Sequence, residues 1–519
     1  MKKIIICLSA LCLFTSCNDF LDREPFDQMD ANDYNKNDKE VNTSVLACYN
    51  GIHKALDREF FLTEVRSDNA RNRNQGPTGS TDLEITQLDI FKPETSNALN
   101  NAYWEAVYHN IANCNTVLES LGNVSDEALR IQFEGEARFI RGYHYFNLVR
   151  LYGPVFLIKK RISANESKWT VRSTQEDVYQ TIIEDLDFAA NNLPERYSDD
   201  QLGRADQWAA KTLLAKVYLT LAYNGATKDK ALLEKAKGLL EDVRDNSPYE
   251  LLTESGNAGT PYANIFATGN EMNKELIFVS RYTAGGKGIG SPFANYFAPS
   301  ASEDAVIYGS GSGYNYPSED LISAYKSETG DNRLDVNIEE TWTNKVGVVQ
   351  YVSWVKKYYS PVTVRYDAEN DWPIIRYADV LLMLGEIINE LDGPTTEACS
   401  YLNATRERAG LTAIMPASRV EYREAMLKER RLEFAFENQR FFDLVRTNKI
   451  IDVMAHYFPT ERMRNQSSGS YGTYYTNPKY NSYVGNPVLE KWQLLLPIPY
   501  NVIISATNAT QNAGYSSTN

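Results

Sequence analysis

The chain has 519 residues, enough for about three domain-sized units or for one large continuous architecture. Hydrophobic residues make up 43% and charged residues 23%, which is typical of a globular protein and not of a disordered one. The formal net charge of −15 argues against nucleic acid as a partner, because contacts with phosphate require clustered Lys and Arg. The 34 Tyr, 20 Phe and 7 Trp favour either a binding surface or half-buried helix faces, since tyrosine combines an apolar ring with a polar tip.

The first residues have the pattern of a secretory signal. Lys2 and Lys3 precede an apolar run, Ile4–Phe14, that is too short for a membrane span of about 20 residues. Small residues and then Cys17 follow, a pattern similar to a bacterial lipobox, although Phe14 stands where Leu is usual. We therefore expect residues 1–16 to be a lipoprotein signal peptide and Cys17 to carry the lipid. An ordinary cleaved signal with an incidental cysteine is the alternative.

Helical patterns dominate after a polar tether that we place at residues 17–40. Ser173 or Thr174 can cap one helix at its start, and Gly153-Pro154 ends another. The helices 206–223 and 229–243 resemble a tetratricopeptide unit, and 377–391 with 395–409 form a second such pair. The expected helices are 38–58, 103–121, 134–151, 173–193, 206–223, 229–243, 377–391 and 395–409.

The helix pairs are expected to stack, because each pair leaves one apolar face open. Helix pairs near 103–151 and 176–223 are candidates for further, more divergent copies. Residues 244–375 and 457–500 are rich in Gly, Ser, Pro and Tyr and lack a helical period, with short strands expected at 275–281 and 348–355. The predicted fold class is therefore all-α dominated: tetratricopeptide-like helix pairs form a solenoid scaffold packed against an irregular, loop-rich half with a few short strands.

A run of alternating charges marks the last third of the chain. Glu429, Glu433 and Glu437 recur every four residues beside Arg430 and Arg431, a spacing that puts them on one helix face where neighbouring turns can pair. Two carboxylates about 5–9.5 Å apart could instead serve glycoside hydrolysis. We favour a structural ion network. No metalloprotease, nucleophile-elbow or phosphate-loop motif occurs, so no catalytic residue, cofactor or metal is expected.

A series of further motifs is spread in order along nearly the whole chain. They are 17–22, 64–70, 104–108, 136–153, 203–204, 376–381, 403–410, 429–437, 497–499 and 511–515. Together they resemble the SusD/RagB family of outer-membrane nutrient-binding lipoproteins. The segment Glu136–Gly153 is the most specific of them.

The resemblance implies a fold, a place in the cell and a partner. The fold is an all-α body with four tetratricopeptide-like helix pairs, divided into an N-terminal SusD-like region at 41–245 and a C-terminal SusD/RagB region at 246–519. The protein would be held by lipid on the outside of the outer membrane. There it would sit as a hinged lid on a TonB-dependent, SusC-like transporter and deliver an oligosaccharide, in some members a peptide, without catalysis. A surface glycoside hydrolase and a helical scaffold that gates the transporter without binding substrate are the alternatives.

Two regions have the residue types that a sugar requires. A sugar ring has an apolar face and a rim of hydroxyls, so its site needs an aromatic plate with planar polar partners. Residues 66–74 are dense in Arg, Asn and Asp, and residues 295–316 carry aromatic side chains in loops. A turn-stabilising role for the acid and amide at 68 and 69, and packing for any single tyrosine, are the alternatives. The candidate substrate-binding residues are Asp68, Asn69, Arg71, Arg73, Tyr296, Tyr314 and Trp342.

Overall fold

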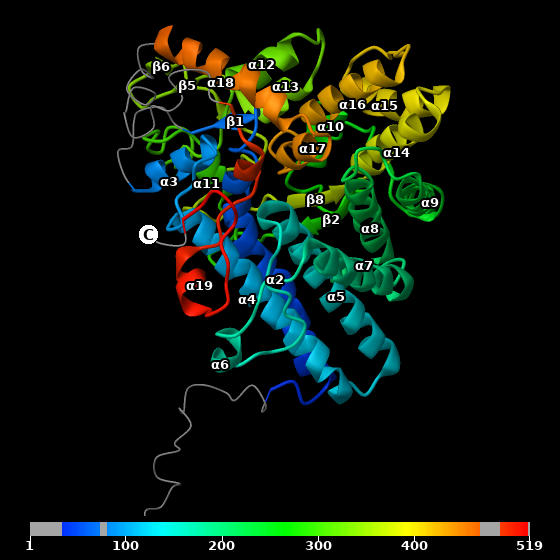
Figure 1. The fold of residues 1–519 in the computed structure, drawn as a ribbon. Helices are drawn as coiled ribbons and strands as arrows, with labels where there is room; N and C mark the ends of the chain where they lie inside the picture. The colour runs from blue at the N-terminus through cyan, green and yellow to red at the C-terminus, as the bar shows by residue number, and fades with distance from the viewer. Residues whose placement is uncertain (1–33, 73–79, 468–487, 517–519) are drawn as a thin grey trace, which may run out of the picture.

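The structure is a computed structural model that describes residues 34–72, 80–467 and 488–516. In these ranges the long helices pack as four pairs, α2 with α4, α5 with α7, α8 with α9 and α14 with α15, and α14 lies against α9 (Figure 1). The predicted all-α, tetratricopeptide-like scaffold is confirmed. The long helices are α2 (Asp38–Leu62), α4 (Ala98–Ser120), α5 (Glu127–Tyr152), α7 (Gln175–Asn192), α8 (Gln207–Ala222), α9 (Lys230–Asn246), α14 (Tyr377–Asp392), α15 (Thr396–Arg408), α16 (Arg419–Glu433) and α18 (Ile450–Ser467).

The pairing of the first helices differs from the expected one. Sequence proximity suggested pairs at 103–151 and 176–223, that is α4 with α5 and α7 with α8. In the structure the more extensive packing is between α2 and α4 and between α5 and α7. The close approach of α5 and α7 is possible because Gly142 has no side chain: a Cβ there would lie 3.1 Å from the Leu186 side chain. The α4–α5 and α7–α8 contacts therefore join successive pairs.

The helix start predicted at Thr174 and the helix end predicted at Gly153 are both present in the structure. The Thr174 hydroxyl accepts a hydrogen bond from the backbone N–H of Asp177 at 3.1 Å, so it caps α7. Gly153 ends α5 with a φ of 72°, a conformation that other residues rarely adopt. These two caps are readable from the sequence because a cap depends only on a few neighbouring residues.

The loop-rich half contains short helices and two-stranded sheets. The expected strand at 275–281 is β2 (Leu276–Ser280), which pairs antiparallel with β8 (Trp372–Arg376). The expected strand at 348–355 is broken into β6 and β7, which pair with different partners, β5 and β4. The other elements are α3 (Ser80–Asp89), η2 (Leu121–Asn123), α6 (Ala164–Ser167), η3 (Asp199–Gln201), α10 (Pro261–Ile265), α11 (Phe293–Phe297), α12 (Glu319–Lys326), α13 (Arg333–Asn337), α17 (Arg440–Arg446), η5 (Lys491–Leu494), α19 (Tyr500–Ser505), β1 (Ala70–Arg71), β3 (Tyr316–Pro317), β4 (Ile338–Glu339), β5 (Trp342–Thr343), β6 (Val349–Gln350) and β7 (Trp354–Val355).

The irregular texture expected at 457–500 is wrong for its first residues, because α18 continues to Ser467. One hydrophobic core nevertheless joins the two halves of the molecule. The Phe139 ring of α5 meets the Phe278 ring of β2 edge-on, with centroids 4.9 Å apart. The helix α9, which ends at Asn246 beside the expected regional boundary, packs on α14 beyond it.

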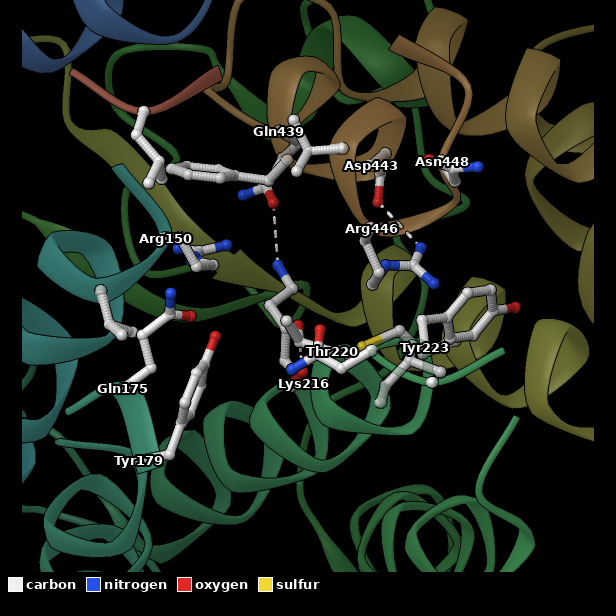
Figure 2. Close-up of a pocket in the computed structure, with 18 of the residues that line it drawn as sticks. Arg150, Gln175, Tyr179, Lys216, Thr220, Tyr223, Gln439, Asp443, Arg446 and Asn448 are labelled. Carbon is white, nitrogen blue, oxygen red and sulfur yellow. Dashed lines mark hydrogen bonds and ion pairs between the residues drawn. The ribbon is translucent and has the colours of Figure 1, made fainter. Parts of the chain in front are cut away.

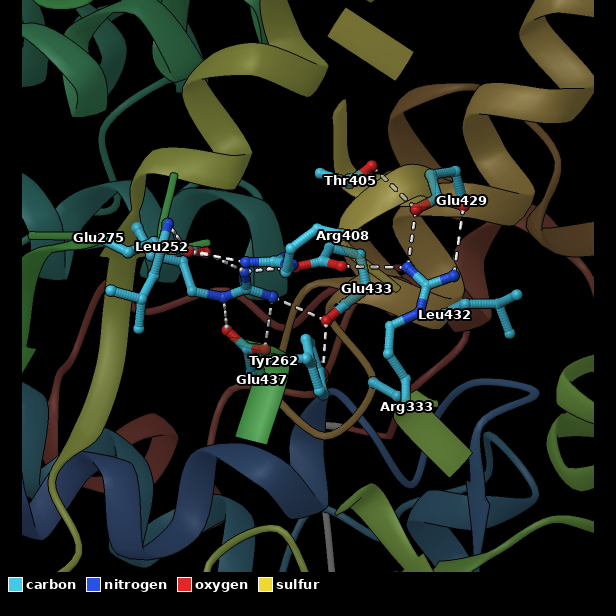
Figure 3. A network of polar contacts seen from close by, with 12 residues as sticks. Leu252, Tyr262, Glu275, Arg333, Thr405, Arg408, Glu429, Leu432, Glu433 and Glu437 are labelled. Carbon is cyan, nitrogen blue, oxygen red and sulfur yellow. Dashed lines mark hydrogen bonds and ion pairs between the residues drawn. The ribbon is translucent and has the colours of Figure 1, made fainter. Parts of the chain in front are cut away.

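A network of buried ion pairs holds the C-terminal helices to the loop-rich half (Figure 3). Glu433 is fully buried and accepts from Arg376 at 2.5 Å, from Arg333 at 3.0 Å and from Arg408. Arg333 also pairs with Glu429 at 2.7 Å. The partners therefore come from other elements and not from neighbouring turns of α16, so the expected pairing within the helix is wrong while the expected structural network is confirmed. Burial would raise the pKa of Glu433, but Arg408, Arg376 and Arg333 hold it well below its usual range.

The C-terminal segment closes over the first helices. Arg66, fully buried after α2, donates to the carbonyl oxygens of Gln493 and Leu494, both at 3.0 Å. Its guanidinium also lies over two aromatic rings, those of Phe91 and Phe441, at 4.9 and 4.6 Å. Residues more than 400 positions apart in the sequence are thus neighbours in the core.

None of the helices in the described ranges is both long enough and apolar enough to span a membrane.

Candidate functional site

Three tyrosine side chains form a cluster in the loop-rich half. Tyr296 comes from α11, Tyr314 from the loop before β3 and Tyr366 from the loop before β8. The ring centroid of Tyr296 lies 5.6 Å from that of Tyr314 and 5.3 Å from that of Tyr366. Tyr366 is 36% exposed, whereas the other two are half-buried, so the cluster presents one edge to solvent. We call these three residues the tyrosine cluster.

The scaffold supports the cluster from below. The Phe61 ring of α2 meets Tyr314 edge-on with centroids 5.2 Å apart, and Phe60 lies 6.2 Å from Tyr296. Both phenylalanines are almost completely buried. Because aromatic pairs prefer such edge and tilted arrangements, the packing fixes the tyrosine rings before any ligand arrives.

One buried amide connects the three loops that carry the cluster. The Asn295 side chain donates from Nδ2 to the carbonyl oxygens of Tyr308 and Ser310, both at 3.0 Å, and accepts at Oδ1 from the N–H of Tyr366 at 2.8 Å. Its own carbonyl accepts from the N–H of Ser312 at 2.8 Å. Asn295 is fully buried and its three side-chain bonds are partly buried, so water competes with them only in part. We call this arrangement the Asn295 clasp.

Polar and charged groups surround the rings. The Arg365 guanidinium lies 4.5 Å from the centroid of the Tyr366 ring, and the Tyr366 hydroxyl is 3.2 Å from Ser312 Oγ. Burial raises the pKa of Tyr296, so its hydroxyl stays protonated at neutral pH and can donate or accept. Asp57 of α2 lies close enough to Tyr296 for its charge to affect the tyrosine. Burial raises the pKa of the Asp57 carboxyl to about 6. Aromatic faces with hydroxyl, guanidinium and carboxylate neighbours suit a sugar ring.

The second predicted region lies beside the tyrosine cluster. Arg71 of β1 stands opposite Tyr316 of β3 in a two-stranded antiparallel pair. The two loops that the sequence singled out are therefore joined through their backbones. Their proximity could not be read from the sequence, where more than 200 residues separate them, because it depends on this strand pairing.

Asp68 and Asn69 have roles inside the protein. Asp68 is 2% exposed and pairs with Arg440 at 2.7 Å. Burial alone would raise its pKa, but Arg431 and Arg440 lower it to about 2. Asn69 donates to Glu64 at 3.2 Å and accepts from Arg431 at 3.0 Å. Both side chains join the turn after α2 to arginines of the C-terminal helices, and we leave them out of the proposed ligand site.

The remaining predicted residues lie elsewhere. Arg71 is 6% exposed, which leaves little of it for a ligand. Trp342 is half-buried in the β5–β6 hairpin and makes no ring contact with the tyrosine cluster in the described ranges. Arg73 and Cys17 lie outside the residues that the structure describes. In the described part of the chain, no group of three or more His, Cys, Asp or Glu side chains is arranged to hold a metal ion.

Comparison with known proteins gives the family. A sequence model described as "SusD family" matches residues 216–515, and one described as "Starch-binding associating with outer membrane" matches residues 19–219. The chain belongs to the SusD family. The predicted resemblance is thereby confirmed.

Relatives in the SusD family cover nearly all of the chain. SusD-like protein P25 of Formosa agariphila is 25% identical, with 99% of each chain covered, and a SusD-like protein of Bacteroides ovatus is 28% identical, with 88% of this chain and 84% of that one covered. A solved laminarin-binding SusD-like protein has a TM-score of 0.74 at 25% identity, covering 92% of this chain and 99% of its own. Surface glycan-binding protein A of Bacteroides thetaiotaomicron, solved with laminarihexaose, has a TM-score of 0.72 at 19% identity, covering 92% and 99%.

Sequence reasoning missed part of the site in this SusD-family chain. Tyr366, which belongs to the cluster, and Arg365 and Asp57, which border it, were not singled out. The Arg-Tyr pair at 365–366 stands in an irregular stretch, and Tyr366 has a φ of 63°, which is unusual for a bulky residue. An aromatic residue beside a cation in a loop was the available signal, but only the fold brings it to Tyr296.

Proposed function

We propose that this chain is a surface lipoprotein that captures oligosaccharides and delivers them to a TonB-dependent, SusC-like outer-membrane transporter. The observation that carries the capture step is the tyrosine cluster, preformed by the Asn295 clasp and edged by charged groups. SusD-family structures of the same fold include a laminarin-binding protein and a complex with laminarihexaose, which supports a glucan as the first ligand to test.

Calorimetric titration with laminarihexaose, maltohexaose and a tripeptide panel tests the ligand class. We expect heat with at least one glucan, and a Tyr366→Ala variant that binds about tenfold more weakly, since one aromatic stacking contact is worth about 1 kcal/mol or slightly more. Tyr401→Ala is the control, because Tyr401 lies on α15, half-buried like Tyr296 and Tyr314 but outside the cluster. Equal losses in both variants, or binding to peptides only, would overturn the assignment of the site.

We infer that the protein binds without cleaving. The carboxylates that could form a glycosidase pair, Glu429 and Glu433, are buried and engaged by arginine side chains, so a substrate cannot reach them. The same titration mixtures should contain no shortened oligosaccharides after overnight incubation. Mass spectrometry should first show that no other enzyme copurifies with the protein. Release of products by such a preparation would favour the hydrolase alternative.

We also propose the anchor and the partner. A lipid on Cys17 would hold the protein on the outer face of the outer membrane, and the SusC-like transporter would receive the captured chain. Cys17→Ala should move the protein from the membrane fraction to the soluble fraction; retention in the membrane contradicts the lipid anchor. Mild solubilisation of the wild-type membrane should copurify a barrel protein, and its absence would favour a binding protein that acts alone.

A further inference from the structure

A second concave site lies in the scaffold, away from the tyrosine cluster. It is a cavity of about 560 Å³ bounded by α5, α7, α8, α14, α17 and the C-terminal segment (Figure 2). Small-molecule sites in proteins commonly measure about 300–1,000 Å³. None of its lining residues belongs to the cluster or the clasp. We call it the scaffold cavity.

The scaffold cavity is basic, although the chain as a whole is acidic with a net charge of −15. Three of its basic side chains are neutralised by carboxylates: Lys216 and Arg430 pair with Asp379, and Arg446 pairs with a glutamate and an aspartate. The remaining two have no carboxylate within 4 Å in the described ranges. The basic residues are Arg150, Lys216, Arg430, Arg446 and Lys491, and the one acidic residue of the described lining is Asp443.

Arg150 is built into the wall of the scaffold cavity. Its guanidinium is held between the rings of Phe146 and Phe442, at 3.7 and 3.6 Å from their centroids. Nε donates to the Phe146 carbonyl at 3.1 Å and Nη2 donates to Asn147, whereas Nη1 has no acceptor among the described residues. Burial lowers the pKa of Arg150 to about 10, which leaves it charged at neutral pH. A cation held rigidly in this way loses little side-chain entropy when an anion binds.

Other unpartnered groups line the same space. Lys491 of η5 is exposed and is the second cation without a carboxylate. The Tyr179 hydroxyl points toward Arg150 in Figure 2, and Gln175 lies one turn before it on α7. Neither side chain has a hydrogen-bond partner in the residues that the structure describes. Apolar side chains complete the wall, namely Val149, Leu219, Met383, Phe442, Val445 and Leu495.

The lining therefore combines three features: two free cations, free hydroxyl and amide groups, and an apolar wall. An inorganic anion would contact only the cations, and a neutral sugar would use only the hydroxyl and amide groups and the apolar wall. We propose that the scaffold cavity binds a sugar acid, whose carboxylate contacts Arg150 and Lys491 and whose hydroxyls contact Tyr179 and Gln175. This site is independent of the proposed capture of glucans at the tyrosine cluster.

Calorimetric titration of the purified protein with sodium galacturonate tests the proposal. We expect saturable binding that weakens as salt is added, because the attraction between charges is screened. Lys491→Glu should weaken binding by about tenfold to a hundredfold, the range of one charge-assisted contact. Lys491 is exposed, so this change should leave the melting temperature unaltered. Lys287→Glu, the same charge change at an exposed residue that does not line the cavity, should bind like the wild type.

Two further variants separate the contacts. Arg150→Gln should abolish binding, and Tyr179→Phe, which removes only a hydroxyl, should weaken it by about fivefold to tenfold. Galacturonate and trigalacturonate distinguish the source of the ligand: binding of the monomer identifies a free sugar acid, and binding of the trimer alone identifies the end of a captured chain. Absence of binding, equal affinity for galactose or inorganic phosphate, or an unaffected Lys491→Glu variant would overturn the proposal.

Discussion

The Asn295 clasp makes a sharp prediction about how the tyrosine cluster is kept ready for a ligand. Asn295→Ala removes three side-chain hydrogen bonds at once, two to the carbonyl oxygens of Tyr308 and Ser310 and one from the N–H of Tyr366. It changes no residue of the cluster itself. Any effect on ligand binding must therefore arise through the position of the loops.

The size of the effect follows from the three bonds. Each contributes about 1 kcal/mol net, and a buried group left without a partner costs about 1–3 kcal/mol. All three bonds are partly buried, so water can replace part of what each contributes. We therefore expect a loss of about 2–4 kcal/mol in the free energy of unfolding. Glucan affinity should fall by about tenfold or more, since Tyr366 is no longer held 5.3 Å from Tyr296.

Urea unfolding and calorimetric titration with laminarihexaose measure the two quantities on the same preparation. Asn264→Ala is the control, because this buried amide donates at 2.9 Å to the carbonyl of Glu254, which is not part of the cluster or the clasp. The control should lose stability and keep affinity. If Asn295→Ala lost stability but bound the glucan like the wild type, the clasp would not preorganise the site and the reasoning would be refuted.

Three further changes probe the fold. Burial raises the pKa of Asp57 from 3.8 to about 6, so the folded state favours the neutral acid, and the stability it contributes is full below about pH 4 and lost as the pH rises through 6. Asp57→Asn should accordingly raise the free energy of unfolding at pH 7.5 by about 3 kcal/mol and leave it unchanged near pH 3. Glu433→Gln leaves buried arginine charges without full compensation and should cost about 3–5 kcal/mol in urea unfolding. Gly51→Ala would place a Cβ 2.0 Å from a side-chain atom of α4 and should lower stability by about 1–3 kcal/mol.

Two of these three predictions have a control variant. Glu424→Gln alters an exposed glutamate on the same helix as Glu433 and should change stability by less than about 0.5 kcal/mol. Gly122→Ala meets no atom within 4 Å, so the steric cost at Gly51 should be missing there. If the Asp57→Asn protein were less stable at pH 7.5, the carboxylate would have a charged partner. If Glu433 and Glu424, or Gly51 and Gly122, gave equal losses of stability, burial would not determine the free energy lost.

The scaffold was predictable because its signals are local. The cap at Thr174 and the stop at Gly153 each depend on a few neighbouring residues, and a helical period marks the helices that were expected. The helices α16 and α18 were not among them. Pairing of the first helices was not predictable, because α2 finds α4 across an intervening segment and through contacts that the period does not specify. The 348–355 stretch was read as one strand because β propensity does not reveal where a strand changes partner.

The site was predictable only in part for the same reason. Tyr296 and Tyr314 were found because tyrosines in loops suggest a binding surface, but Tyr366 joins them only through the fold. Asp68 is a residue type that commonly contacts a sugar, but its partner in the structure is Arg440, which lies 372 residues further along the chain. A sequence motif shows which groups are present, while long-range pairing determines which of them remain free for a ligand.

The contact between Arg66 and the C-terminal segment has a consequence for the order of assembly. The guanidinium needs the carbonyl oxygens of Gln493 and Leu494, so the turn after α2 cannot reach its final surroundings until almost the whole chain is available. Contacts of such sequence separation close slowly and late. Truncation before residue 488 would leave the buried Arg66 guanidinium beside α2 without its carbonyl acceptors. A change at the C-terminal end of the chain would therefore destabilise the N-terminal part. The early helices must therefore avoid aggregation until the last segment arrives.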